Sequence, residues 1–182
     1  MDTTQSQNSL GDVKNWIAST IESHRERAQP IARLGFPRLG EYFSPSLLAA
    51  AKFVPVDDLP FVPLTALGLP QYAEFEGMSV NAVTYVDYCF VQTHFVDKES
   101  LYFHELVHMT QWRLLGIERF ILEYGNALIH GRNYHTNPFE TMAYELQLDF
   151  DLGRAPFDVE REVARRIDLQ FSSDAPAKFA SK

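Results

Sequence analysis

Hydrophobic residues near the start of the chain recur at the spacing of a helix. Those on one stripe are Val13, Trp16, Ile17 and Ile21. Their spacing predicts an amphipathic helix from Asp12 to Gln29, which Pro30 ends. A shorter helix is predicted from Pro45 to Lys52, because Ser44 is a favourable N-cap and proline is favoured at the first helical position.

The pattern changes twice in the middle of the chain. Residues 53–77 contain many prolines and glycines without a regular hydrophobic period, which predicts a long loop with short extended pieces. Loops of this length are often functional. From Met78 to Phe95 the residues are mainly β-branched and aromatic, which predicts one or two strands with a turn near Asp87.

The second half of the chain is predicted to be helical. Glycines and prolines divide it into four helices with the bounds Glu99–Leu115, Ile117–His130, Asn137–Leu152 and Asp158–Phe171. Gly116 can end the first of these, and Asn137 followed by Pro138 is a typical start for the third. Strands that precede a block of helices indicate an α+β fold rather than alternating βαβ units.

Composition and charge narrow the class of protein. The chain has 182 residues, of which 46% are hydrophobic, and this is enough for one domain with a substantial core. The formal net charge of −8 argues against nucleic acid or a membrane as a partner, because both require a basic face. Arginines within residues 161–166 alternate with acidic residues, as on a solvated helix face. We expect a single domain over residues 1–182, with flexible tails at residues 1–10 and 172–182.

Cysteine content and the N-terminus bear on the compartment. Cys89 is the only cysteine, so neither an internal disulfide nor a multi-thiolate metal site can form. It lies in an apolar stretch, where we expect a buried thiol rather than a nucleophile. The N-terminus has no signal-peptide pattern, and no apolar run reaches the ~20 residues of a membrane-spanning helix. These features predict a cytoplasmic protein, with export by a non-classical route left open.

One motif contains residues with clear chemical potential, H-E-x-x-H at residues 104–108. Residues four apart lie on the same face of a helix, so His104 and His108 can bind one ion. Glu105 can then act as general base on water activated by zinc. A chance occurrence of the string and two histidines buried for structural reasons are the simpler alternatives. The apolar residues around the motif place it within a buried helix, which favours a zinc site.

A catalytic zinc usually has three protein ligands, so a third must lie elsewhere. Glu140, at the start of a later helix, is the first candidate. Its spacing from Asn137 also fits a capping box, in which the glutamate turns back to the backbone of the cap, and spacing alone leaves these two interpretations level. The other candidates are His130, His135, Glu123 and Glu145. Tyr134 and Tyr144 are candidate hydrogen-bond donors to an oxyanion.

The motif and the residues after it resemble the small gluzincin-type metallopeptidases called minigluzincins. The matching residues are His104, Glu105, His108, Gln111, Tyr134, Asn137, Pro138, Glu140 and Ala143. The resemblance covers the chain from about residue 78 to 150 and implies a zincin-like fold, with an edge strand along the substrate cleft. It also implies that Glu140 is the third zinc ligand. One position departs from the pattern, because larger gluzincins often have an acidic residue where this chain has Tyr144.

Together these features predict a zinc-dependent metalloendopeptidase. The expected zinc ligands are His104, His108 and Glu140. Glu105 would be the general base and Tyr144 a further catalytic residue, while a strand within Val83–Val91 would seat a peptide or protein substrate. The alternatives are a zinc-binding interaction module without proteolysis, and a latent peptidase whose cleft is occupied by residues 53–77 or by the C-terminal tail. The sequence leaves the oligomeric state open.

Overall fold

The computed structural model describes residues 3–129 and 134–171. Within them the chain forms helices and a four-stranded sheet, so the predicted α+β class is confirmed. The strands are β1 (Gln29–Pro30), β2 (Lys52–Val56), β3 (Ala82–Tyr85) and β4 (Tyr88–Gln92). Their order across the sheet is β1-β2-β4-β3, with β2 parallel to β4 and the other two pairs antiparallel.

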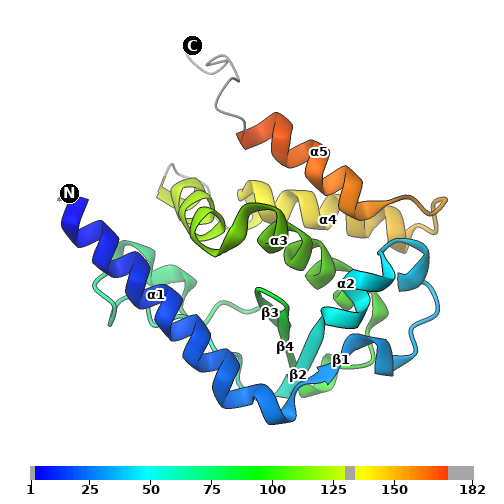
Figure 1. Cartoon of the computed structure of the whole chain (residues 1–182), viewed down its shortest axis with the longest axis horizontal. Helices are drawn as coiled ribbons and strands as arrows, with labels where there is room; N and C mark the ends of the chain where they lie inside the picture. The colour runs from blue at the N-terminus through cyan, green and yellow to red at the C-terminus, as the bar shows by residue number, and fades with distance from the viewer. Residues whose placement is uncertain (1–2, 130–133, 172–182) are drawn as a thin grey trace.

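Helices cover both sides of this sheet. The α-helices are α1 (Thr3–His24), α2 (Pro45–Ala50), α3 (Glu99–Ile129), α4 (Pro138–Asp151) and α5 (Val159–Phe171). Figure 1 shows α3, α4 and α5 gathered on one side of the sheet and α1 running along the other. No helix in the described parts of the chain has the length and hydropathy to span a membrane.

Each face of the sheet contributes to a hydrophobic core. On one face, Phe53 and Cys89 pack with residues of the C-terminal helices, and the expected burial of Cys89 is confirmed. On the other face, Val54 and Phe90 pack with Ile17 of α1. Neighbouring residues of β2 and of β4 therefore point to opposite cores, as the pleat of a strand requires. Burial on both faces is typical of paired parallel strands.

α1 starts earlier and ends earlier than predicted. It begins at Thr3, so most of the expected N-terminal tail is helical, and it ends at His24. A 3₁₀ turn, η1 (Arg25–Arg27), follows, and Gln29 is already part of β1. The first turns are polar and show no apolar stripe, which is why the pattern did not predict them, and Gln29 is extended, as the residue before a proline prefers to be. The expected tail at residues 172–182 lies outside the described residues.

β2 occupies part of the segment that was predicted to be a loop. It includes Pro55, a residue type that argues against an interior strand. β1 pairs only with Lys52 and Phe53, so Pro55 lies past the end of β1. No strand on that side therefore needs the backbone N–H that proline lacks. The short helix α2 consequently ends at Ala50. The rest of the predicted loop is irregular apart from a 3₁₀ helix, η4 (Pro70–Phe75).

β3 and β4 form the predicted pair of strands, with the predicted turn between them. Tyr85 pairs with Tyr88, which leaves Val86 and Asp87 as the turn. Within the described residues, Val86 is the one non-glycine with a positive φ, 57°. Because β4 lies between β2 and β3, only β3 of this hairpin lies at an edge of the sheet. Of the two strands within Val83–Val91, β3 is therefore the one with a free edge, and the seating of a peptide on it stays a prediction.

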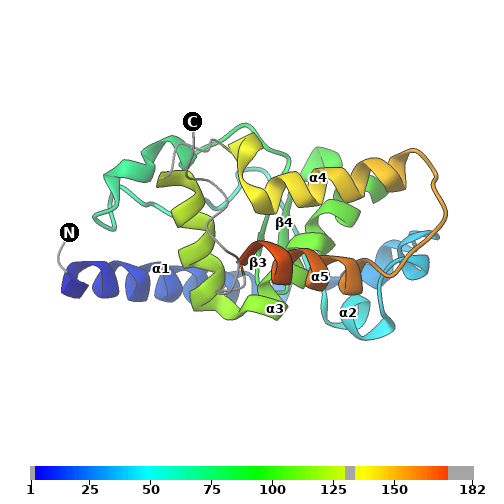
Figure 2. The ribbon, with the colours of Figure 1, turned by 90° about the horizontal axis from the view of Figure 1, so that it is seen from above.

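The helices that bear the motif residues follow the prediction closely. Gly116, with φ 74° and ψ 163°, divides α3 into two segments that correspond to the two helices predicted around it. Figure 2 shows the second segment turning away from the first. α4 starts after Asn137, whose side chain accepts a hydrogen bond from the Phe139 backbone N–H at 3.1 Å. On α5, Arg165 and Arg166 pair with Glu162, as predicted for a solvated face of mixed charge.

Candidate metal centre

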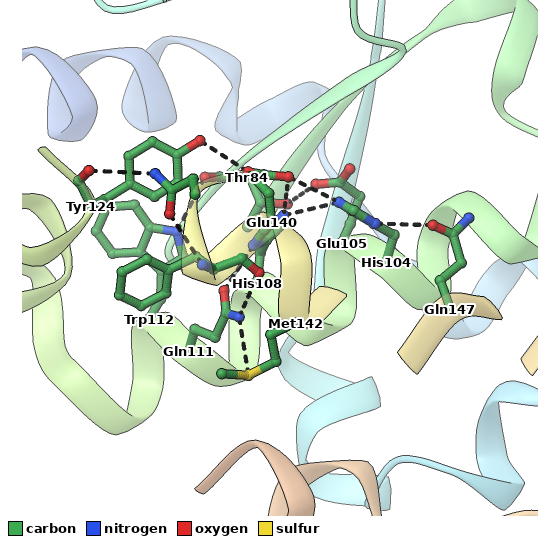
Figure 3. Close-up of polar contacts among 12 residues, drawn as sticks. Thr84, His104, Glu105, His108, Gln111, Trp112, Tyr124, Glu140, Met142 and Gln147 are labelled. Atoms are coloured by element: carbon green, nitrogen blue, oxygen red, sulfur yellow. Dashed lines mark hydrogen bonds and ion pairs between the residues drawn. The ribbon is translucent and has the colours of Figure 1, made fainter. Parts of the chain in front are cut away.

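The three expected metal ligands meet where α4 begins beside the first segment of α3. His104 and His108 lie one turn apart on α3, and Glu140 lies in the first turn of α4. The two Nε2 atoms are 3.0 Å apart, and each lies 3.4 Å from Oε2 of Glu140. Figure 3 shows these three side chains pointing toward one another. We call this group the ligand cluster, and its ligand atoms all lie within 4.8 Å of one another.

The cluster is almost completely buried. His104 and Glu140 are each 4% exposed, and His108 is 7% exposed. Oε1 of Glu140 accepts a hydrogen bond from the Tyr124 hydroxyl at 2.9 Å, but Oε2 has no hydrogen-bond partner among the described residues. A buried carboxylate oxygen without a donor is costly, so a cation between Oε2 and the two imidazoles would satisfy it.

The capping-box interpretation of Glu140 is wrong. The backbone N–H of Asn137 donates to the carbonyl of Tyr134 at 3.2 Å, not to the glutamate. The N-cap of α4 is provided by Asn137 alone, through its bond from Phe139. This leaves the Glu140 carboxylate to face the two histidines.

Gln111 determines which nitrogen of His108 carries a proton. Its Nε2 donates to the carbonyl of Phe139 at 3.1 Å, which directs its Oε1 to Nδ1 of His108 at 2.8 Å. An amide oxygen only accepts, so Nδ1 of His108 must be the donor. In the neutral imidazole, Nε2 then presents its lone pair to the cluster, as a metal ligand requires.

Gln147 has the same relation to His104. Its Oε1 lies 3.0 Å from Nδ1 of His104, and its Nε2 donates to Oγ of Ser100 at 2.8 Å. Larger gluzincins often support a ligand histidine from the position that Tyr144 occupies here, one turn after Glu140, whereas Gln147 lies one turn further on the same helix face. The spacing of seven residues between Glu140 and Gln147 was the signal in the sequence that could have identified Gln147. Both supporting groups are therefore neutral amides, with no carboxylate in this role.

Three tyrosines lie around the cluster. Tyr144 packs its ring on that of His104, with centroids 4.5 Å apart, and remains 42% exposed. Its hydroxyl is hydrogen-bonded to Tyr134, and burial raises the pKa of both phenols, so both stay protonated near neutral pH. Tyr124, which the sequence did not single out, is the donor to Glu140. A role for Tyr144 as donor to an oxyanion stays a prediction.

Glu105 lies beside the cluster and is fixed by the sheet. Its Oε2 accepts a hydrogen bond from Oγ1 of Thr84 at 2.7 Å, and Thr84 lies on the edge strand β3 (Figure 3). No described residue donates to its other oxygen, which can therefore accept a proton. Glu105 is 4% exposed, so bulk water does not compete strongly for that oxygen.

The histidines and Glu140 interact strongly. Burial lowers the pKa of His108, but the Glu140 carboxylate outweighs this effect and raises it to about 9. Burial would raise the pKa of Glu140, yet the two histidines hold it far below its usual range. The Nε2 atoms are 3.0 Å apart, so without a cation between them the two imidazoles would have to share a proton, because two lone pairs repel each other at that distance. A divalent cation would replace that proton.

Among the described residues, two of the other candidate ligands, Glu123 and Glu145, pair with arginines and not with the cluster. Glu123 pairs with Arg119 at 3.8 Å, and Glu145 pairs with Arg166 at 2.7 Å. His130 lies outside the described residues, as does the side chain of His135.

A cavity of about 420 Å³ adjoins the cluster. Glu105, His108 and Glu140 line it on one side. The other walls come from α1, residues 61–80, β3 and the second segment of α3, and they are mainly apolar. Within residues 53–77, the predicted loop proposed above as an occupant of a latent cleft, residues 61–75 contribute to a wall of this cavity. No sequence pattern pointed to it, because its walls come from parts of the chain that are far apart in the sequence.

Comparison with known proteins does not assign the chain to a group, since no family model, no curated protein and no solved structure matches it. The chemistry of the site must therefore be inferred from its own geometry.

Proposed function

We propose that this protein is a zinc-dependent metallopeptidase whose active site has a zincin-like arrangement. The observation that supports this most is the convergence, in a buried cluster, of two Nε2 atoms and one carboxylate oxygen that accepts no hydrogen bond from the described residues. A carboxylate with one oxygen left for proton transfer, Glu105, lies directly beside them. The resemblance of the sequence to minigluzincins points in the same direction.

The donor set fits zinc. Two imidazole nitrogens and one carboxylate oxygen are a common protein ligand set for catalytic zinc, and three protein ligands leave a position open. Harder cations such as magnesium and calcium prefer oxygen ligands. When bound at His104, His108 and Glu140, zinc would supply a Lewis acid that polarises a carbonyl and makes water nucleophilic near neutral pH.

The chain's own residues would orient the ligands and move protons. Gln111 and Gln147 hold the two imidazoles with Nε2 directed inward, and Tyr124 holds the Glu140 carboxylate. Glu105 would accept a proton from the attacking water at its unpaired oxygen and then deliver it to the leaving amine. Thr84 keeps that carboxylate in place during both transfers.

The edge strand β3 is the proposed place for an extended peptide. It lies beside the cluster, because Thr84 from this strand contacts Glu105. The carbonyl of Thr84 already accepts a hydrogen bond from Nε1 of Trp112 at 3.2 Å. A bound peptide would therefore pair with β3 through other main-chain groups.

The test compares zinc-loaded wild type with Glu105→Gln on an unstructured protein substrate. The variant keeps the size of the side chain but removes the base, so we expect a loss of about 10²–10⁴-fold in cleavage rate with unchanged zinc content. Glu26→Gln, at an exposed position, is the matched control and should leave the rate unchanged.

Two other outcomes separate the alternatives. Zinc binding without any cleavage that Glu105→Gln abolishes would contradict the peptidase and favour a zinc-binding interaction module. A protein that binds no zinc would contradict both.

A further inference from the structure

We infer that the substrate has a bulky apolar group next to the scissile bond, and that this group enters the cavity beside the ligand cluster. We call this cavity the apolar chamber. The inference depends on the proposed function only for the nature of the bond that is cleaved.

The walls of the apolar chamber are suited to an apolar ligand. Representative side chains in these walls are Val13, Phe61, Leu69, Phe75, Trp112 and Phe120. No lysine or arginine lines the chamber among the described residues, whereas Glu105 and Glu140 do. The chamber walls away from the cluster therefore offer no cationic partner to an acidic group, and burying an unpaired charge there would be costly.

The polar groups lie at the place where a reacting bond would be. Glu105, His108 and Glu140 line the chamber, and the Tyr124 hydroxyl beside them is bound to Glu140. A ligand with an apolar body and one polar reacting group matches this distribution, which is common in enzyme sites. The chamber thus connects the proposed chemistry with a particular kind of substrate.

The size of the chamber sets the size of the group. About 420 Å³ lies within the range of sites that hold whole small molecules, so the chamber can take a group larger than a short aliphatic side chain. Gly125 helps to keep it open. It lies in the wall formed by α3, and a Cβ atom there would be 3.4 Å from the hydroxyl oxygen of Tyr72 in the facing wall.

Binding of alkyl hydroxamates to the zinc-loaded protein tests this inference. The hydroxamate group binds zinc, and the tail represents the apolar group of the substrate. Trp112 lines the chamber, so its fluorescence in a Trp16→Phe background reports occupancy. From acetohydroxamate through hexanohydroxamate to octanohydroxamate, we expect affinity to rise by roughly threefold to fourfold per methylene.

Gly125→Leu should fill the chamber without touching the cluster. Leucine favours the helix more than glycine does, so the variant should fold, and its melting curve verifies this. We expect octanohydroxamate to bind at least about tenfold more weakly, because the new side chain takes the volume of several methylenes, while acetohydroxamate affinity and zinc content stay the same. Gly11→Leu is the matched control, since Gly11 lies in α1 outside the chamber walls with nothing near its Cβ position.

Octanamide separates failure of this inference from failure of the proposed function. It has the same tail but is a poor zinc ligand, and in the metal-free protein it should still change Trp112 fluorescence. That result would support the chamber even if the protein proved not to cleave peptides. Affinity that does not depend on tail length in the zinc-loaded protein, or a folded Gly125→Leu variant with unchanged octanohydroxamate affinity, would overturn the inference.

Discussion

Zinc binding should release one proton from the ligand cluster. In the metal-free protein, His108 has a pKa of about 9, because the buried Glu140 carboxylate stabilises its charged form. Zinc needs the lone pair of Nε2 of His108, so the proton on this nitrogen must leave when the ion binds. Below pH 9 the apparent zinc affinity should therefore rise tenfold per pH unit. Between pH of about 6.5 and 8.5 this amounts to about a hundredfold, or roughly 2.7 kcal/mol.

The assay is a competition with a chelator of known pH dependence, repeated across this interval. Calorimetry in buffers of different ionisation enthalpy gives the number of released protons directly. Arg166→Gln is a suitable control, because Arg166 pairs with Glu145 and Glu162 away from the cluster and should not affect the slope. An affinity that stays constant between these pH values would refute the account of a shared proton.

Three further predictions follow from contacts around the cluster. Gln111→Leu removes the acceptor that keeps the proton on Nδ1 of His108, so zinc affinity should fall by about 10–100-fold in a chelator competition, whereas Gln170→Leu at an exposed position should leave it unchanged. Asn137→Ala removes the N-cap of α4 and should lower the free energy of unfolding by about 1 kcal/mol in urea denaturation, and an unchanged midpoint would contradict this. In the metal-free protein the pKa of His108 is raised from 6.5 to about 9. The charged His108 therefore stabilises the folded protein fully below pH 6.5, and this contribution is lost as the pH rises through 9. The free energy of unfolding should fall by about 3 kcal/mol over this interval. Denaturation midpoints that increase over the same pH interval would contradict the predicted direction of this pH dependence.

Local signals in the sequence were sufficient to predict the helices and part of the ligand cluster. His104 and His108 share a helix face because they are four residues apart, and that geometry does not depend on the rest of the fold. The start of α4 was likewise marked by Asn137 and Pro138, which act within one turn. Glu140 was different, because spacing could not distinguish a capping box from a ligand. Only the packing of α4 against α3 decides where its carboxylate points.

Features that depend on distant partners could not be predicted in this way. β2 contains Pro55 and becomes a strand because β4 pairs along its whole length. Tyr124 reaches Glu140 because Gly116 turns the second segment of α3 toward α4. The apolar chamber needs α1 and residues 61–80 to meet the sheet, and neither segment has a pattern that specifies this meeting.

The most direct test of the central claim is zinc-edge X-ray absorption on the zinc-saturated protein, with zinc content measured on the same sample. The account predicts one zinc ion per chain, bound only by nitrogen and oxygen at about 2.0–2.2 Å, with the scattering pattern of two imidazoles. Zinc that is lost on dialysis, or retained with no imidazole scattering, would contradict the claim that His104, His108 and Glu140 form a metal site.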